Sequence, residues 1–161
     1  AQIGEALTQL EIEANNEGTA LGLVDWELRF DVDRETKGGS VQRGFSVSVL
    51  SPHNSKPVPW EAWSGGEAQR LIVAAQMGLA DVIRSRTGSK INLEVWDEPT
   101  TGMSPQGVDD LLQALHTRAI REQRQIWVVD HRTLGFNRFA GTCGVVKTDK
   151  GSHFDFSGMP V

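Results

Sequence analysis

The 161-residue sequence lacks several features that would define its class at once. Its single cysteine, Cys143, excludes an internal disulfide and any zinc site built on paired cysteines, which fits a reducing cytoplasm. No apolar run approaches the roughly 20 residues of a membrane span, and no signal peptide is visible. The four histidines are scattered without the spacing of metal ligands. These absences predict a soluble, cytoplasmic domain with no membrane partner.

The composition and charge fit one globular domain covering residues 1–161. A hydrophobic content of 39% is ordinary for such a domain, and the length allows one sizeable core. The net charge of −5 argues against strong nucleic-acid binding by this chain alone, because such binding depends on clustered cations. Arginines do gather where helices are expected to end, at Arg84, Arg86, Arg118, Arg121 and Arg124. We expect them to be solvated partners of helix dipoles.

The spacing of apolar residues predicts the order of the elements. A helical stripe covers residues 1–15, and two alternating runs at 22–33 and 44–52 predict an antiparallel hairpin. After residue 60 a helix, a strand, a helix and a strand follow at 64–86, 91–98, 105–123 and 124–132, and a final hairpin is expected over 141–158. This alternation predicts a parallel sheet covered by helices.

Polar residues stand where ligands of such sheets bind, at the carboxyl ends of strands. Asp97 and Glu98 end one strand, and His131, preceded by Asp130 as a possible orienting partner, ends the next. Carboxylates in such positions suit Mg²⁺ and an attacking water, but exposed acidic pairs and surface histidines are also common. The sequence "SGGE" opens a helix, where glycines let backbone amides approach an anion. The same letters also spell an ordinary capping box.

The order of these motifs resembles the C-terminal ATPase lobe of ABC-class ATPases. "WSGGE" resembles the signature motif, "LEVWDEPT" the Walker B strand, "VVDH" the switch-histidine loop, and "TGMS" takes the place of the D-loop. The glutamate of SGGE and the layout upstream are more similar to the coiled-coil DNA-repair ATPases of the SbcC and SMC groups. The resemblance implies an α/β fold with a mostly parallel sheet flanked by helices. A β-hairpin and a stub of the returning coiled-coil helix, residues 1–15, would precede it.

The resemblance also implies roles for particular residues. In such families the signature contacts the γ-phosphate of ATP bound to an opposite head. The residues that take this place here are Ser64, Gly65, Gly66 and Glu67. Asp97 would serve Mg²⁺, Glu98 the attacking water and His131 the γ-phosphate. Met103 and Ser104 stand in the D-loop where leucine and aspartate are usual, a departure that bears on communication between heads.

One motif of the family is missing, the phosphate-binding loop G-x-x-x-x-G-K-[ST]. In "GTCGVVKT" (residues 141–148) Val146 stands where a glycine must precede the lysine, so this stretch does not qualify. We therefore expect half of a split head, inactive alone, that requires its own N-terminal ATPase segment. An incomplete sheet predicts an exposed strand edge near "IWVVD" and an unstable or self-associating fragment. Further partners implied by the resemblance are a second head, an SbcD-type nuclease subunit and, through the full complex, DNA.

Two alternatives remain open. "EAQR" after the glycines is similar to transporter signatures, so the chain could be the nucleotide-binding lobe of an ABC transporter. The altered D-loop instead favours a non-catalytic regulatory or dimerisation module, which Asp97, Glu98 and His131 argue against. Glu94 interrupts an otherwise apolar strand, and because an unpaired buried carboxylate is costly, we expect it to meet water or a basic partner.

Overall fold

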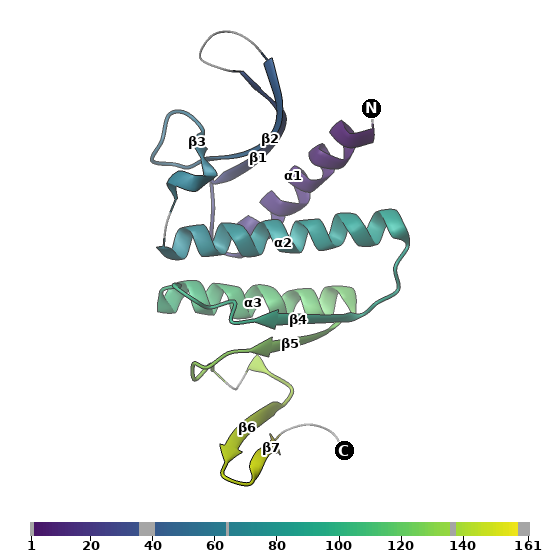
Figure 1. Cartoon of the computed structure of the whole chain (residues 1–161), viewed down its shortest axis with the longest axis vertical. Coiled ribbons are helices and arrows are strands. Elements are labelled where there is room, and N and C mark those ends of the chain that lie inside the picture. Colours follow the sequence, from purple (N-terminus) through teal and green to yellow (C-terminus); the bar gives the residue numbers. More distant parts are fainter. Residues whose placement is uncertain (1, 36–40, 64, 136–137, 158–161) are drawn as a thin grey trace.

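The computed structural model describes residues 2–35, 41–63, 65–135 and 138–157, arranged around one long helix, α2 (Gly65–Thr87). Figure 1 shows α2 crossing the middle of the molecule, with the N-terminal helix and hairpin on one side of it. The third helix and a pair of strands lie on the other side, and a second hairpin lies beyond them. This arrangement confirms the predicted α/β class.

The N-terminal part contains helix α1 (Gln2–Ala20) and strands β1 (Glu27–Glu35), β2 (Val41–Leu50) and β3 (Val58–Pro59). The predicted hairpin is confirmed, because β1 and β2 pair antiparallel. Strand β3, which the sequence did not suggest, adds to the free edge of β2. A short 3-10 helix, η1 (Trp60–Ala62), then leads toward α2.

Helix α1 is longer than the predicted stub of residues 1–15, because it continues to Ala20. Its last turns pack against α2, where a Cβ added to Gly78 would lie 2.5 Å from the backbone nitrogen of Ala14. The Asn15 side chain also accepts a hydrogen bond from the Leu28 amide at 2.7 Å and donates one to the Leu28 carbonyl at 2.9 Å. Tertiary contacts therefore sustain the helix through residues of modest helical propensity.

The C-terminal part contains β4 (Leu93–Asp97), α3 (Pro105–Glu122) and β5 (Gln125–Val129), followed by β6 (Thr142–Thr148) and β7 (Gly151–Ser157). Helix α3 begins as predicted, with Pro105 in its first turn and the Ser104 side chain accepting a hydrogen bond from the Gly107 amide. Strands β4 and β5 pair in parallel, whereas β6 and β7 form a separate antiparallel pair within the described residues.

The core lies where α1, α2, α3 and β1 meet, and its fully covered residues include Ala14, Leu21, Leu28, Leu71, Val73, Ala74, Met77 and Leu111. The β4–β5 pair contributes only one of its faces to this core, through Trp96, Ile126 and Val128. Its other face leaves apolar side chains exposed, namely Leu93, Val95, Trp127 and Val129. Parallel sheets are normally covered on both faces, whereas this outer face is uncovered within the described residues.

Candidate functional site

The turn after β4 holds Glu98 in an unusual backbone conformation. Its φ is 46°, in the left-handed region that non-glycine residues adopt infrequently. The Glu98 amide donates to the Val129 carbonyl at 2.7 Å, so the turn is tied to the end of β5. Thr101 donates from its amide to the Glu98 carbonyl at 3.2 Å, and Met103 donates to that of Thr100 at 3.0 Å. The Glu98 side chain is thereby presented at the carboxyl ends of both parallel strands.

His131 lies beside Glu98, as the motif order predicts for strand ends of one sheet. Its Nδ1 atom is 3.5 Å from Oε1 of Glu98, and both side chains are more than half exposed. Asp97 is also exposed and precedes Glu98 at the end of β4. Carboxylate oxygens are the ligands Mg²⁺ prefers, so the donor chemistry of Asp97 fits that ion. The structure thus brings the Glu98 carboxylate and the His131 imidazole together in a position open to a ligand, with Asp97 exposed next to Glu98 in the chain.

Asp130 does not hydrogen-bond to His131, because its nearest oxygen lies 4.0 Å from Nδ1. Its carboxylate instead accepts a hydrogen bond from the Thr100 hydroxyl at 2.6 Å and another from the Arg132 amide at 2.9 Å. Burial alone would raise the pKa of Asp130, but these two hydrogen bonds and the neighbouring His131 outweigh it and lower that pKa. The idea that Asp130 directly orients His131 is therefore corrected: its partners are Thr100 in the turn after β4 and the Arg132 amide.

The start of α2 packs against the predicted D-loop of the same chain. Gly65 has a φ of 73°, and a Cβ added to Gly66 would lie 3.0 Å from the Gly102 carbonyl oxygen and 3.3 Å from the Met103 Cα. A Cβ at position 66 would therefore crowd this backbone, whether or not a phosphate also binds there. Ser64 lies outside the described residues, so its capping and phosphate-binding roles stay predictions. Glu67 is exposed in the first turn of α2.

The two residues of the predicted D-loop differ in what they offer a ligand. The Met103 side chain is buried in the core, so only its backbone can reach a bound molecule. Ser104 is exposed but uses its hydroxyl to cap α3. Two contacts missed from the sequence hold this region: Gln69 donates to the Pro99 carbonyl at 3.3 Å, and Arg132 donates to that of Met103 at 3.4 Å. Both residues adjoin predicted motifs, which is the signal that could have indicated them.

The arginines expected to be solvated include two that are buried, which corrects that expectation. The side chains of Arg118 and Arg124 are only 1% and 3% exposed. Arg118 pairs with Glu17 of α1, Asp81 of α2, Glu94 of β4 and Glu122 of its own helix.

Glu94 also pairs with Arg124, so the prediction that this carboxylate meets a basic partner is confirmed. Arg84 and Arg121 each pair with Glu122 at the edge of the same network. The four arginines therefore share acidic partners, but only Arg118 and Arg124 are buried, whereas Arg121 stays exposed.

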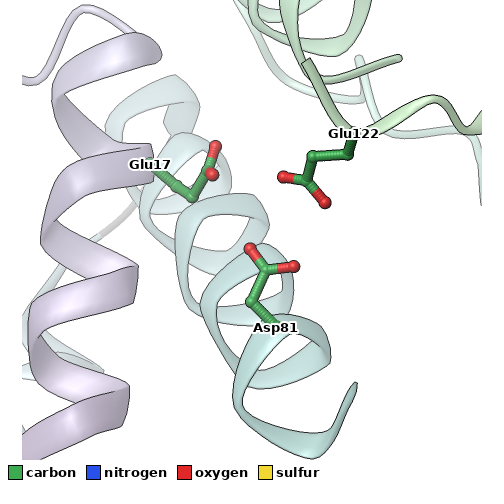
Figure 2. Close-up of side chains that lie close together, drawn as sticks. All are labelled: Glu17, Asp81 and Glu122. Atoms are coloured by element: carbon green, nitrogen blue, oxygen red, sulfur yellow. The ribbon is translucent and has the colours of Figure 1, made fainter. Parts of the chain in front are cut away.

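Figure 2 shows Glu17, Asp81 and Glu122 pointing toward one another from three elements, a grouping that could hold a cation. Guanidinium groups already supply the positive charge, because Arg118 reaches all three carboxylates at 2.7–3.3 Å. Burial alone would raise the pKa of Asp81, but hydrogen bonds and charge from Arg118 and Arg124 lower it below its ordinary value. The cluster is thus an ion-pair network that joins α1, α2, α3 and β4.

No protein-family model matches the chain. The chain is 38% identical over 73 residues to UvrABC system protein A of Thermus thermophilus, a match that covers 45% of this chain and 7% of that protein. This chain therefore corresponds to only a small part of that relative. No helix in the described ranges is both long and apolar enough to cross a membrane.

Several solved structures share the architecture. A chain from a structural study of ATP-driven dimerization and DNA-stimulated activation of SMC ATPases superposes with a TM-score of 0.71 at 14% identity, covering 95% of this chain and 86% of that one. The Smc head domain of Pyrococcus furiosus, with an extended coiled coil and bound to the C-terminal domain of ScpA, gives 0.67 at 15% identity, covering 93% and 35%. The SMC head domain of Thermotoga maritima gives 0.60 at 17% identity, covering 96% and 49%.

Proposed function

From the fold that this chain shares with SMC head domains, we propose that it is the C-terminal half of an ATPase head that pairs with a second head across bound ATP and Mg²⁺. The observation that carries the proposal is the approach of His131 to Glu98 at 3.5 Å, at the carboxyl ends of two parallel strands. The nearby start of α2, with its glycines, supplies the surface that would face the partner head.

The uncovered outer face of β4 and β5 supports the need for a second segment that covers it. Leu93, Val95, Trp127 and Val129 together expose an apolar surface on a parallel pair, where a covering element is normally present. We assign this cover to the N-terminal ATPase segment of the same protein, which would also bring the missing phosphate-binding loop. The chain alone is then inactive, and residues 1–161 make up a single lobe whose α1 continues toward a coiled coil.

The chemistry assigned to this chain follows from the exposed groups. Mg²⁺ would neutralise phosphate charge as ATP is hydrolysed, and Asp97 would hold this ion. Glu98 would orient and deprotonate the attacking water, and His131 would donate to an oxygen of the γ-phosphate. Ser64, Gly65, Gly66 and Glu67 would contact the nucleotide of the opposite head, while the Met103 backbone and Ser104 would line the interface between heads.

We further propose an SbcC-like role in the cytoplasm, in which head pairing controls an SbcD-type nuclease subunit acting on DNA ends. This finer assignment depends on the motif resemblance of residues 63–148. The local identity with UvrABC system protein A favours a second candidate, an ATPase that serves a UvrABC-type system instead. Pull-down of the full-length protein from its host would separate them, since a co-purifying nuclease subunit supports the first and Uvr proteins the second.

The decisive experiment uses Glu98→Gln in the full-length protein. Loss of the general base should lower ATP turnover by about 10²- to 10⁴-fold while ATP still drives the heads to pair. Glu5→Gln is the matched control, because Glu5 is an exposed glutamate on α1, away from the site. Turnover is measured by phosphate release and pairing by light scattering. Equal turnover in the two variants would remove Glu98 from the mechanism, and an inactive parent protein would reject the ATPase assignment.

A further inference from the structure

Thr100 is a polar side chain buried in the turn that carries Glu98. It is 1% exposed, and its hydroxyl donates to Oδ2 of Asp130 at 2.6 Å. The Asp130 side chain is itself only 2% exposed. An O–H···O⁻ contact of this length is a strong, charge-assisted hydrogen bond. Removing either the Thr100 hydroxyl or the Asp130 carboxylate would leave the other group buried without its hydrogen-bond partner. This costs more free energy than the loss of a neutral contact at the surface.

This hydrogen bond joins the two loops that carry the candidate catalytic groups. Thr100 lies two residues after Glu98, and Asp130 immediately precedes His131. The backbone of Glu98 lies in a sparsely populated region, with φ of 46°, and such conformations persist only where surrounding contacts enforce them. The Thr100–Asp130 contact adds a side-chain link to the backbone hydrogen bond from Glu98 to Val129.

We propose that Asp130 is a positioning residue. Through its hydrogen bond with Thr100, it fixes the position of the Glu98 carboxylate relative to the His131 imidazole. The inference rests on the proposed ATPase function for its catalytic meaning. Asp130 touches neither water nor nucleotide in this role, and it does not act by hydrogen bonding to His131. The Arg132 amide, which also donates to Asp130, anchors the carboxylate from the β5 side.

The test compares Thr100→Val with Thr100→Ser in the full-length protein. Valine keeps the shape of threonine but removes the hydroxyl, whereas serine keeps the hydroxyl and loses a methyl group. Thr100→Val should lower kcat by about 10- to 100-fold with KM for ATP little changed, because small displacements of catalytic groups cost about that much. Thr100→Ser should retain most of the turnover. Asp130→Ala should lower kcat at least as far as Thr100→Val where it folds.

Hydrogen exchange provides a second readout that does not depend on turnover. Amides of residues 98–103 should exchange faster in Thr100→Val than in the parent, and Thr100→Ser should restore slow exchange. Unchanged exchange in Thr100→Val overturns the inference, as does faster exchange with an unchanged kcat. If the parent protein hydrolyses no ATP, the proposed function fails, while the exchange result still decides whether this contact holds the turn.

Discussion

Replacing Arg118 by methionine should destabilise the chain by about 3–5 kcal/mol, because it removes one partner of a buried charge network. The guanidinium pairs with Glu17, Asp81, Glu94 and Glu122 at 2.7–3.3 Å, and none of these carboxylates is more than 15% exposed. Methionine fills a similar length without charge, so the carboxylates would keep their burial and lose their shared cation. Domains of this kind are stable by about 5–15 kcal/mol, so the loss is a large fraction of the total.

Urea unfolding followed by tryptophan fluorescence measures this effect, since the chain has five tryptophans. With an m value of about 2 kcal/mol per M, a loss of about 4 kcal/mol lowers the midpoint by about 2 M. Arg86→Met is the matched control, because Arg86 is exposed and has no ion pair within the described residues. Adding Asp81→Asn to Arg118→Met should recover part of the loss. If Arg118→Met and Arg86→Met unfold within about 0.5 kcal/mol of each other, the network does not stabilise the fold.

Two further outcomes follow from the same packing. The pKa of Asp81 in the folded chain is below its ordinary value of about 3.9. The contribution of Asp81 to the free energy of unfolding is therefore complete above that value and is lost as pH falls through the folded pKa. The urea midpoint should therefore drop steeply below about pH 4. An Asp81→Asn variant whose urea midpoint falls with pH as steeply as that of the parent would contradict this. Gly78→Ala should cost about 1–3 kcal/mol in the same assay, since its Cβ would lie 2.5 Å from the Ala14 nitrogen. Gly4→Ala, which meets nothing within 4 Å, should be neutral or stabilising, and equal effects at the two glycines would refute the close helix crossing.

Local sequence patterns predicted the helices whose ends and apolar spacing are visible in the sequence itself. The helix expected at 105–123 is α3, Pro105–Glu122, because its start has a proline and a serine cap. The helix expected at 64–86 is described from Gly65 to Thr87. The juxtaposition of Glu98 and His131 also followed from sequence, since parallel strands present their carboxyl ends at one edge.

Contacts between distant residues account for what the sequence did not reveal. Arg118 looked like a helix-end cation, and its burial depends on Glu17, 101 positions earlier. No local pattern distinguishes such an arginine from a solvated one. Thr100 and Asp130 are 30 positions apart, so their hydrogen bond could be predicted only after β4 and β5 were paired in the correct register. The extension of α1 to Ala20 depended in the same way on packing against α2.

The close crossing of α1 and α2 sets the geometry of any tilt of α1. Its pivot lies near Ala14, where Gly78 lets the two backbones meet. From that point to Gln2 the helix runs about 18 Å at 1.5 Å per residue, so a rotation of about 10° moves the Gln2 end by about 3 Å. Because α2 begins at Gly65, beside the turn of residues 102–104, and meets α1 at Gly78, this one helix spans the distance from that turn to the crossing with α1.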